Sequence, residues 1–215
     1  MDFQKVFDDH IQKFNDRVMP NRKLSRGILN SEGFAFCSIS DHYGVDLIIE
    51  SGVCNGGSTT ILCKYFNDIP IVSIDSELKT EAVVRTSIFH NVTLINGDSH
   101  EMIPQILDAF KDSTIAVLID GPKSINAITL GKKCFDHSHV KVIGIHDLFK
   151  SLYGKIKQDR VMFDKLDIPN RFITDNPEFV STFKYLDGDD TGGYHPKYFT
   201  KEIGGYGPTI GFMLK

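Results

Sequence analysis

The chain has 215 residues, of which 41% are hydrophobic and 24% charged, and its formal net charge is -4. This length suits one domain with its own buried core, and the negative charge argues against nucleic acid or an anionic membrane as the main partner. Because no apolar run could cross a bilayer, the N-terminus lacks a signal-peptide core and the four cysteines lack metal-site spacing, we expect a cytoplasmic protein with reduced thiols.

Helical and strand patterns alternate along most of the chain. Apolar residues at three- and four-residue spacing predict an amphipathic helix over residues 3–18, and Ser31 and Glu32 open a second, short helix. From residue 45 onward, short apolar runs follow helical patterns in turn, which indicates right-handed βαβ units and a parallel sheet. Strands are predicted at 45–49, 69–74, 92–95, 114–119 and 140–145, and helices at 58–66, 77–90, 100–111, 124–135 and part of 148–166.

The C-terminal part differs from this alternation. Two further strands are predicted at 179–186 and 208–214, as an antiparallel pair at the sheet edge. The Gly- and Asp-rich residues 187–207 between them are predicted to form either a mobile lid over a binding site or a disordered surface loop. The predicted fold is α/β: one Rossmann-like, doubly wound, mostly parallel sheet of order 3-2-1-4-5 plus the antiparallel pair. Its single domain comprises a helical extension (1–44), a cofactor-binding core (45–147) and a C-terminal helix with the strand pair (148–215).

A glycine-containing loop follows the first predicted strand, and acidic residues follow the first three strands. In an open α/β sheet, ligands bind beyond the carboxyl ends of the strands, and glycines let the backbone approach them closely. Ser58 is a suitable N-cap for the next helix, and Asp75 can accept hydrogen bonds from both ribose hydroxyls of a nucleotide cofactor. The predicted cofactor-binding residues are Glu50, Ser51, Gly52, Gly56, Gly57, Ser58, Asp75, Ser76, Asp98 and Ser99.

These features resemble the class I S-adenosylmethionine-dependent methyltransferases. That family carries an acid and glycines after strand one, an acid ending strand two and an acid near the adenine after strand three, here matched by Glu50, Asp75 and Asp98. The Gly-Gly-Ser-Thr, Ile-Asp-Gly and His-Asp segments are similar to the branch of small-molecule and sugar O-methyltransferases and the cephalosporin-pathway methyltransferase. The resemblance implies S-adenosylmethionine as cofactor and a small-molecule acceptor. Pro122-Lys123 departs from the pattern of that branch on the substrate side.

A second group of candidate residues ends strands four and five. Asp120, His146 and Asp147 follow neighbouring strands, so we expect them at the same edge as the cofactor. Two carboxylates and an imidazole could hold Mg²⁺ or Mn²⁺, which would fix an acceptor hydroxyl and lower its pKa. His146 could instead act as general base. The alternative is structural: the two aspartates cap helices and His146 packs between loops.

Two other functions compete with methyl transfer. Tyr153 and Lys157 match the Tyr-x-x-x-Lys pair of NAD(P)-dependent short-chain dehydrogenases, but Ser58 stands at that family's third glycine and no serine precedes Tyr153 at the required distance. A non-catalytic cofactor-binding or interaction protein is the third alternative. The sequence does not identify the acceptor, and association into a homo-oligomer stays open.

Overall fold

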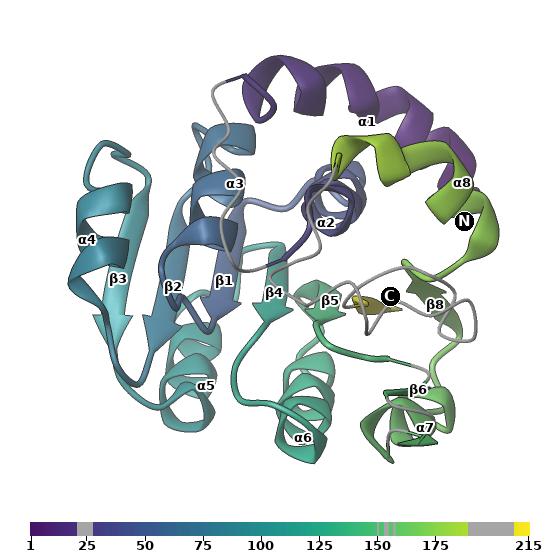
Figure 1. Ribbon diagram of the computed structural model, residues 1–215. Coiled ribbons are helices and arrows are strands. Elements are labelled where there is room, and N and C mark those ends of the chain that lie inside the picture. Colours follow the sequence, from purple (N-terminus) through teal and green to yellow (C-terminus); the bar gives the residue numbers. More distant parts are fainter. Residues whose placement is uncertain (21–27, 150, 153–154, 157, 189–208) are drawn as a thin grey trace.

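The computed structural model describes residues 1–20, 28–149, 151–152, 155–156, 158–188 and 209–215. Its centre is one seven-stranded sheet of order β3-β2-β1-β4-β5-β9-β8 (Figure 1). Strands β1 to β5 are parallel, and β9 pairs antiparallel with both β5 and β8. The predicted order and the antiparallel edge pair are thereby confirmed. The strands span Leu47–Ser51 (β1), Ile71–Asp75 (β2), Val92–Asn96 (β3), Ile115–Ile119 (β4), Val140–Ile145 (β5), Asn170–Ile173 (β8) and Gly211–Leu214 (β9).

Helices cover both faces of the sheet (Figure 1). One face carries α1 (Phe3–Arg17), α2 (Asn30–His42), α3 (Gly57–Tyr65) and α8 (Pro177–Phe183). The other face carries α5 (Ser99–Ala109), α6 (Ile125–Phe135) and α7 (Gln158–Asp164). Helix α4 (Thr80–Thr86) packs against α3 near the β3 edge. This is the three-layer arrangement expected when crossover helices connect parallel strands.

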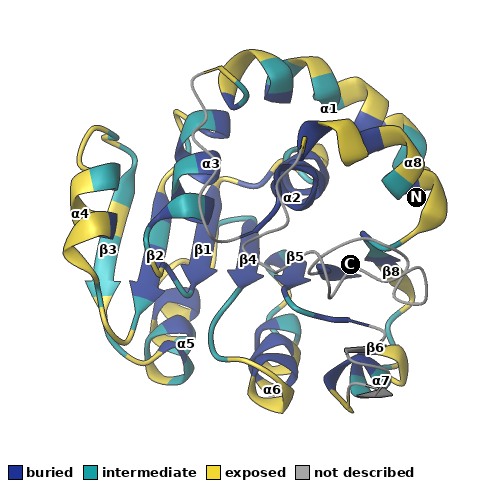
Figure 2. Cartoon of the chain, in the orientation of Figure 1, coloured by how far each residue is buried: buried dark blue, intermediate teal, exposed yellow. Residues whose placement is uncertain are grey.

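The sheet separates two hydrophobic cores. Successive side chains of a strand point to opposite faces, so Ile48 packs with α1, α2 and α3, whereas Leu47 and Ile49 pack with α5 and α6. Strands β1, β4 and β9 are buried over their whole length, while every residue of β3 is either half-buried or exposed (Figure 2). Continuous apolar runs therefore mark strands covered on both faces, as expected for a parallel sheet.

The prediction of a strand at residues 179–186 is wrong. These residues form α8 and a 3-10 turn (Lys184–Leu186), and the strand that pairs with β9 is the earlier β8. The side chain of Asn176 caps α8 by accepting hydrogen bonds from the backbone N–H groups of Glu178, at 2.9 Å, and Phe179, at 3.2 Å. This cap satisfies donors that a helix start leaves unpaired, so the segment is stable as a helix.

Other predicted boundaries also need correction. Ser58 does not cap α3: the helix begins at Gly57 and has Gly56 at its N-cap with a φ of 78°. The helix predicted at 77–90 is limited to α4, and the stretch 148–166 contains the short hairpin β6 (Ser151–Leu152) and β7 (Lys155–Ile156) before α7. Residues 189–208, which include most of the predicted lid, lie outside the described residues. Within the described parts, no helix has the length and apolarity needed to span a membrane.

Candidate functional site

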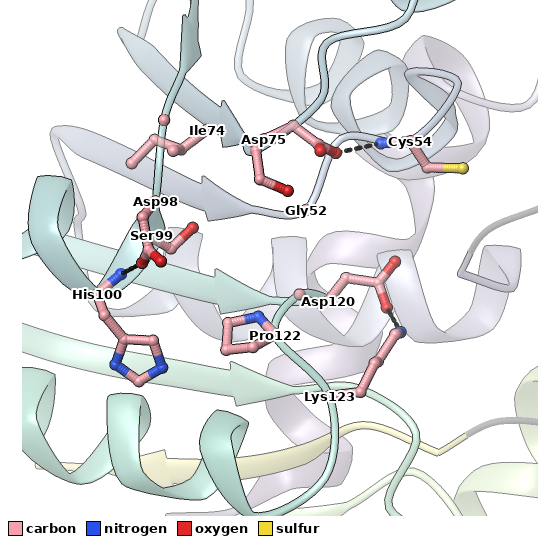
Figure 3. A pocket seen from close by; sticks show the side chains of 13 residues that line it. Gly52, Cys54, Ile74, Asp75, Asp98, Ser99, His100, Asp120, Pro122 and Lys123 are labelled. Atoms are coloured by element: carbon pink, nitrogen blue, oxygen red, sulfur yellow. Dashed lines mark hydrogen bonds and ion pairs between the residues drawn. The ribbon is translucent and has the colours of Figure 1, made fainter.

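A cavity of about 370 Å³ lies at the carboxyl ends of β1, β2, β3 and β4 (Figure 3). Parallel strands bring their carboxyl ends to one edge, so residues distant in sequence meet there. His100 and Lys123 also line this cavity. The predicted site residues that line it are Gly52, Asp75, Ser76, Asp98, Ser99 and Asp120.

The loop after β1 passes very close to the loop after β4. Gly52 has a φ of 93°, and a Cβ atom placed on it would lie 2.6 Å from the backbone nitrogen of Gly121. The carbonyl of Ser51 accepts hydrogen bonds from the N–H groups of Asp120, at 2.7 Å, and Gly121, at 2.9 Å. Only glycine allows both this backbone conformation and this approach. Gly52 therefore brings the ends of the two central strands together at the cavity.

Asp75, at the end of β2, holds the glycine loop in place. Its Oδ2 atom accepts hydrogen bonds from the backbone N–H groups of Val53 and Cys54, both at 2.8 Å, and its Oδ1 atom accepts one from Glu77 at 3.0 Å. A carboxylate offers about four acceptor positions. Three are thus used within the protein, which leaves about one for a ligand hydroxyl in the cavity that Asp75 lines.

Glu50 lies behind the cavity rather than along its wall. It is fully buried and accepts hydrogen bonds from the hydroxyls of Ser58, Thr59 (2.6 Å) and Ser73 (2.7 Å). Burial raises the pKa of Glu50 to about 7, although these three hydroxyls partly offset the effect. Glu50 therefore anchors α3 and β2 to the end of β1, and its direct contact with a cofactor stays a prediction.

The remaining predicted cofactor residues support the loops around the cavity. Asp98 is the N-cap of α5 and accepts a hydrogen bond from the N–H of His100 at 2.7 Å. The Ser51 hydroxyl oxygen lies 2.6 Å from that of Ser99 and donates to the carbonyl of Gly121. Gly56 and Gly57 form the start of α3. These contacts connect the ends of β1, β3 and β4 to one another.

Asp120, His146 and Asp147 do come together, as expected from the ends of β4 and β5. One ligand atom of each lies within 4.8 Å of the others. His146 Nδ1 is 2.5 Å from Asp120 Oδ1, and Lys123 Nζ lies 2.5 Å from that same oxygen and 2.7 Å from Asp147 Oδ2. Asp120 thus contacts His146 and Lys123, and because the N-cap of the following helix α6 is Ser124, Asp120 does not cap that helix.

Glu32 of α2 completes this group on the side away from the cavity. It is fully buried, and its Oε2 atom accepts a hydrogen bond from the Leu29 N–H at 2.9 Å. The same oxygen lies 3.3 Å from His146 Nε2, within ion-pair distance but without the alignment of a hydrogen bond. His146 is thus placed between the carboxylates of Glu32 and Asp120.

The oppositely charged side chains of this cluster shift one another's pKa values. Burial alone would lower the pKa of His146, but Asp120 and Glu32 outweigh it and raise that pKa well above its ordinary value. Burial would likewise raise the pKa of Asp120, yet His146 and Lys123 lower it to about 2. For Lys123, the two aspartates outweigh burial and raise the pKa. For Glu32, burial dominates over His146 and raises the pKa to about 7.

Sequence reasoning did not identify Glu32 or Lys123 as site residues. Lys123 has a detectable signal, because it follows Asp120 by three positions on a short loop. Glu32 has none, since it reaches His146 only through the packing of α2 against β5. Tyr153 and Lys157, the residues of the dehydrogenase alternative, lie outside the described residues.

No protein-family model matches the chain, and no curated protein matches it at a significant level. Solved structures do resemble it. A Klebsiella pneumoniae protein assigned as an O-methyltransferase is 12% identical, with 98% of this chain and 90% of that chain covered and a TM-score of 0.53. The O-methyltransferase TomG from Streptomyces achromogenes, involved in tomaymycin synthesis and solved in complex with SAM, is 14% identical, with coverages of 98% and 90% and a TM-score of 0.50.

An rRNA methylase from Streptococcus thermophilus is 14% identical, with 90% of this chain and 99% of that chain covered and a TM-score of 0.51. All three likenesses extend over almost the whole described architecture. Together with the strand order and the antiparallel edge pair, they show that this chain has the fold of the class I S-adenosylmethionine-dependent methyltransferases.

Proposed function

We propose that this protein binds S-adenosylmethionine and transfers its methyl group to a hydroxyl of a small molecule. One observation carries the proposal: Gly52, Asp75 and Asp98, from the ends of three neighbouring strands, meet Asp120 from a fourth around a single cavity. Such a cavity at the carboxyl edge of an open α/β sheet is where this class of fold binds nucleotides.

The cavity suits the cofactor in size and in chemistry. Its volume of about 370 Å³ falls within the range of roughly 300–1,000 Å³ that is typical of small-molecule sites. The remaining acceptor position of Asp75 can take a ribose hydroxyl, because a carboxylate forms strong charge-assisted hydrogen bonds. Asp98 and His100, which line the same cavity, border the space left for the base.

When bound, the cofactor would supply a methyl group already activated on a sulfonium, and the proton of the acceptor hydroxyl would pass to solvent water. The protein then mainly has to hold the acceptor in line with that methyl group. Asp120 stays ionised and His146 stays protonated, given the directions of their pKa shifts. The proposal therefore assigns His146 a fixed positive charge in place of the general-base role predicted for it.

Charge supports a small molecule as the acceptor. One structural relative is an rRNA methylase, but the present chain has a net charge of -4 and exposes carboxylates beside the cavity. Proteins that bind nucleic acid concentrate Lys and Arg to contact phosphates. A small molecule is therefore the better acceptor for this site, and its chemical identity is left open.

Isothermal titration calorimetry tests the cofactor. We expect binding of S-adenosylmethionine and S-adenosylhomocysteine but not of NAD or NADP. Glu77→Ala serves as the matched control for Asp75→Ala, because Glu77 is an exposed acid two residues away on the same loop. Loss of binding only in the Asp75 variant supports the proposal. Tight binding of a nicotinamide cofactor would overturn it and favour the dehydrogenase alternative.

A further inference from the structure

The candidate metal site contains a cation of its own. Asp120, His146 and Asp147 have the residue types of a divalent-ion site, and their ligand atoms lie close enough for one. However, the ammonium group of Lys123 contacts the carboxylate of Asp120 at 2.5 Å (Figure 3). It also contacts the carboxylate of Asp147 at 2.7 Å. Both aspartates that a metal ion would need are therefore bound to a lysine of the same chain.

The third ligand is also unsuited to a metal. His146 Nδ1 lies 2.5 Å from Asp120 Oδ1, and a nitrogen that donates to a carboxylate has no lone pair for a metal ion. The other ring nitrogen faces Glu32, 3.3 Å away and fully buried. His146 Nδ1 therefore donates to Asp120 while Nε2 faces the Glu32 carboxylate, so neither ring nitrogen presents a lone pair to the space between Asp120 and Asp147.

The balance of charge leads to the same conclusion. In the described part of the chain, the carboxylates of Glu32, Asp120 and Asp147 have two basic side chains, His146 and Lys123, within direct contact distance. Divalent ions bind in proteins where carboxylates bring an excess of negative charge. With both basic side chains in place, this cluster retains little of that excess.

We propose that Lys123 replaces the divalent cation at this site, and that its ammonium group positions the acceptor oxygen. An ammonium has three N–H groups. Two are directed to Asp120 and Asp147, and the third is available to an oxygen in the cavity that Lys123 lines. The role toward the acceptor rests on the proposed methyl transfer. The replacement of the metal does not, because it depends only on contacts within the chain.

The replacement is tested by measuring Mn²⁺ binding to the full-length protein. Electron paramagnetic resonance monitors this binding as a loss of the signal of the free ion. We expect no binding to the wild type at millimolar Mn²⁺. In Lys123→Ala we expect a new site, with an affinity for Mn²⁺ at least about tenfold higher than that of the wild type. Adding Asp147→Asn to that variant should abolish the new site. Lys79→Ala is the matched control, because Lys79 is an exposed lysine beside Cys54 at the rim of the same cavity.

Two results would overturn the proposal. One is Mn²⁺ binding to the wild type that Asp147→Asn removes, since the aspartates would then hold a metal in the presence of Lys123. The other is the absence of binding to a folded Lys123→Ala protein, since the carboxylates would then not form a cation site. Lys123→Gln provides a second folded variant if the alanine protein is unstable. The measurement needs neither cofactor nor acceptor, so its outcome is independent of the calorimetry above.

Discussion

The buried carboxylate of Glu50 makes a specific prediction about stability and pH. Glu50→Gln replaces the ionisable group by a neutral amide of the same shape. The hydroxyls of Thr59 and Ser73 both donate to one oxygen of Glu50, and Ser58 contacts the other. A glutamine can keep its oxygen toward the first two and donate its amide to Ser58, because a hydroxyl both donates and accepts. The substitution itself should therefore cost only about 1 kcal/mol.

The pH dependence is the larger effect. The pKa of Glu50 is raised from its ordinary value of 4.5 to about 7 by burial. Between these values the folded protein binds more protons than the unfolded chain, so the free energy of unfolding falls as pH rises through this window. One pH unit corresponds to about 1.4 kcal/mol, which gives a contribution from Glu50 of about 2–3 kcal/mol between pH 5 and pH 8. Glutamine does not titrate, so the variant lacks this contribution.

Urea unfolding of both proteins at pH 5 and pH 8 measures the effect. Relative to the wild type, Glu50→Gln should gain about 2–3 kcal/mol in free energy of unfolding when the pH is raised from 5 to 8. Glu32 titrates over the same range in both proteins, so the comparison cancels it. The exposed Glu101→Gln is the control and should show no shift. Equal differences at the two pH values would refute the reasoning.

Three further substitutions test other parts of the structure. Gly52→Ala should destabilise the fold by about 1–3 kcal/mol and abolish S-adenosylhomocysteine binding, because φ is 93° and the new Cβ would lie 2.6 Å from the backbone nitrogen of Gly121; unchanged melting and binding would contradict this. Asp75→Ala should weaken cofactor binding by about 1.5–3 kcal/mol, since it removes the loop contacts as well as a ribose acceptor. Calorimetry on the folded variant measures this loss, and an unchanged affinity would contradict the prediction. Asp187→Ala removes two hydrogen bonds, at 2.8 Å each, from the backbone and hydroxyl of buried Ser31, and thermal or urea unfolding should show a loss of about 2–4 kcal/mol; a loss below about 1 kcal/mol would show that Ser31 finds other partners.

The parallel sheet was predictable because its strands are covered on both faces. Continuous apolar runs such as that of β4 (Ile115–Ile119) have no other stable place in a domain of this size. Helix boundaries were less predictable. Ser58 looked like an N-cap, but its hydroxyl donates to Glu50 instead, a contact that depends on how α3 packs against β1. Local sequence cannot reveal a competing partner in another element.

The C-terminal part shows the same limit. Phe179 and Phe183 lie one helical turn apart and both are buried, and Asn176 with Pro177 marks the start of α8. These helical signals were present, but the aromatic residues also fit a strand. The β8 strand is only four residues long, and its two exposed residues give it little hydrophobic pattern. Its identity as a strand depends on pairing with β9.

At the site, residues at strand ends could be predicted and their partners could not. The topology alone brings Asp75, Asp98 and Asp120 to one edge of the sheet. Whether a carboxylate there faces a ligand, a backbone amide or a lysine depends on side-chain packing. Glu32 illustrates this most clearly, because it belongs to the helical extension rather than to any strand end.

The position of β9 constrains how β8 can join the sheet. This strand lies between β5 and β8, and in the described sheet β8 has no other neighbour. The pairs β1–β2, β2–β3 and β4–β5 join nearby chain segments, whereas β1–β4 (Leu47 with Ile115) and β5–β9 (Ile145 with Gly211) each join segments far apart in the sequence. Pairings over such long separations form slowly, because closing the chain between the two strands costs conformational entropy before their contacts stabilise the pair. The outer strand β8 reaches the rest of the described sheet only through β9, so it can join the sheet together with β9 or after it, but not before.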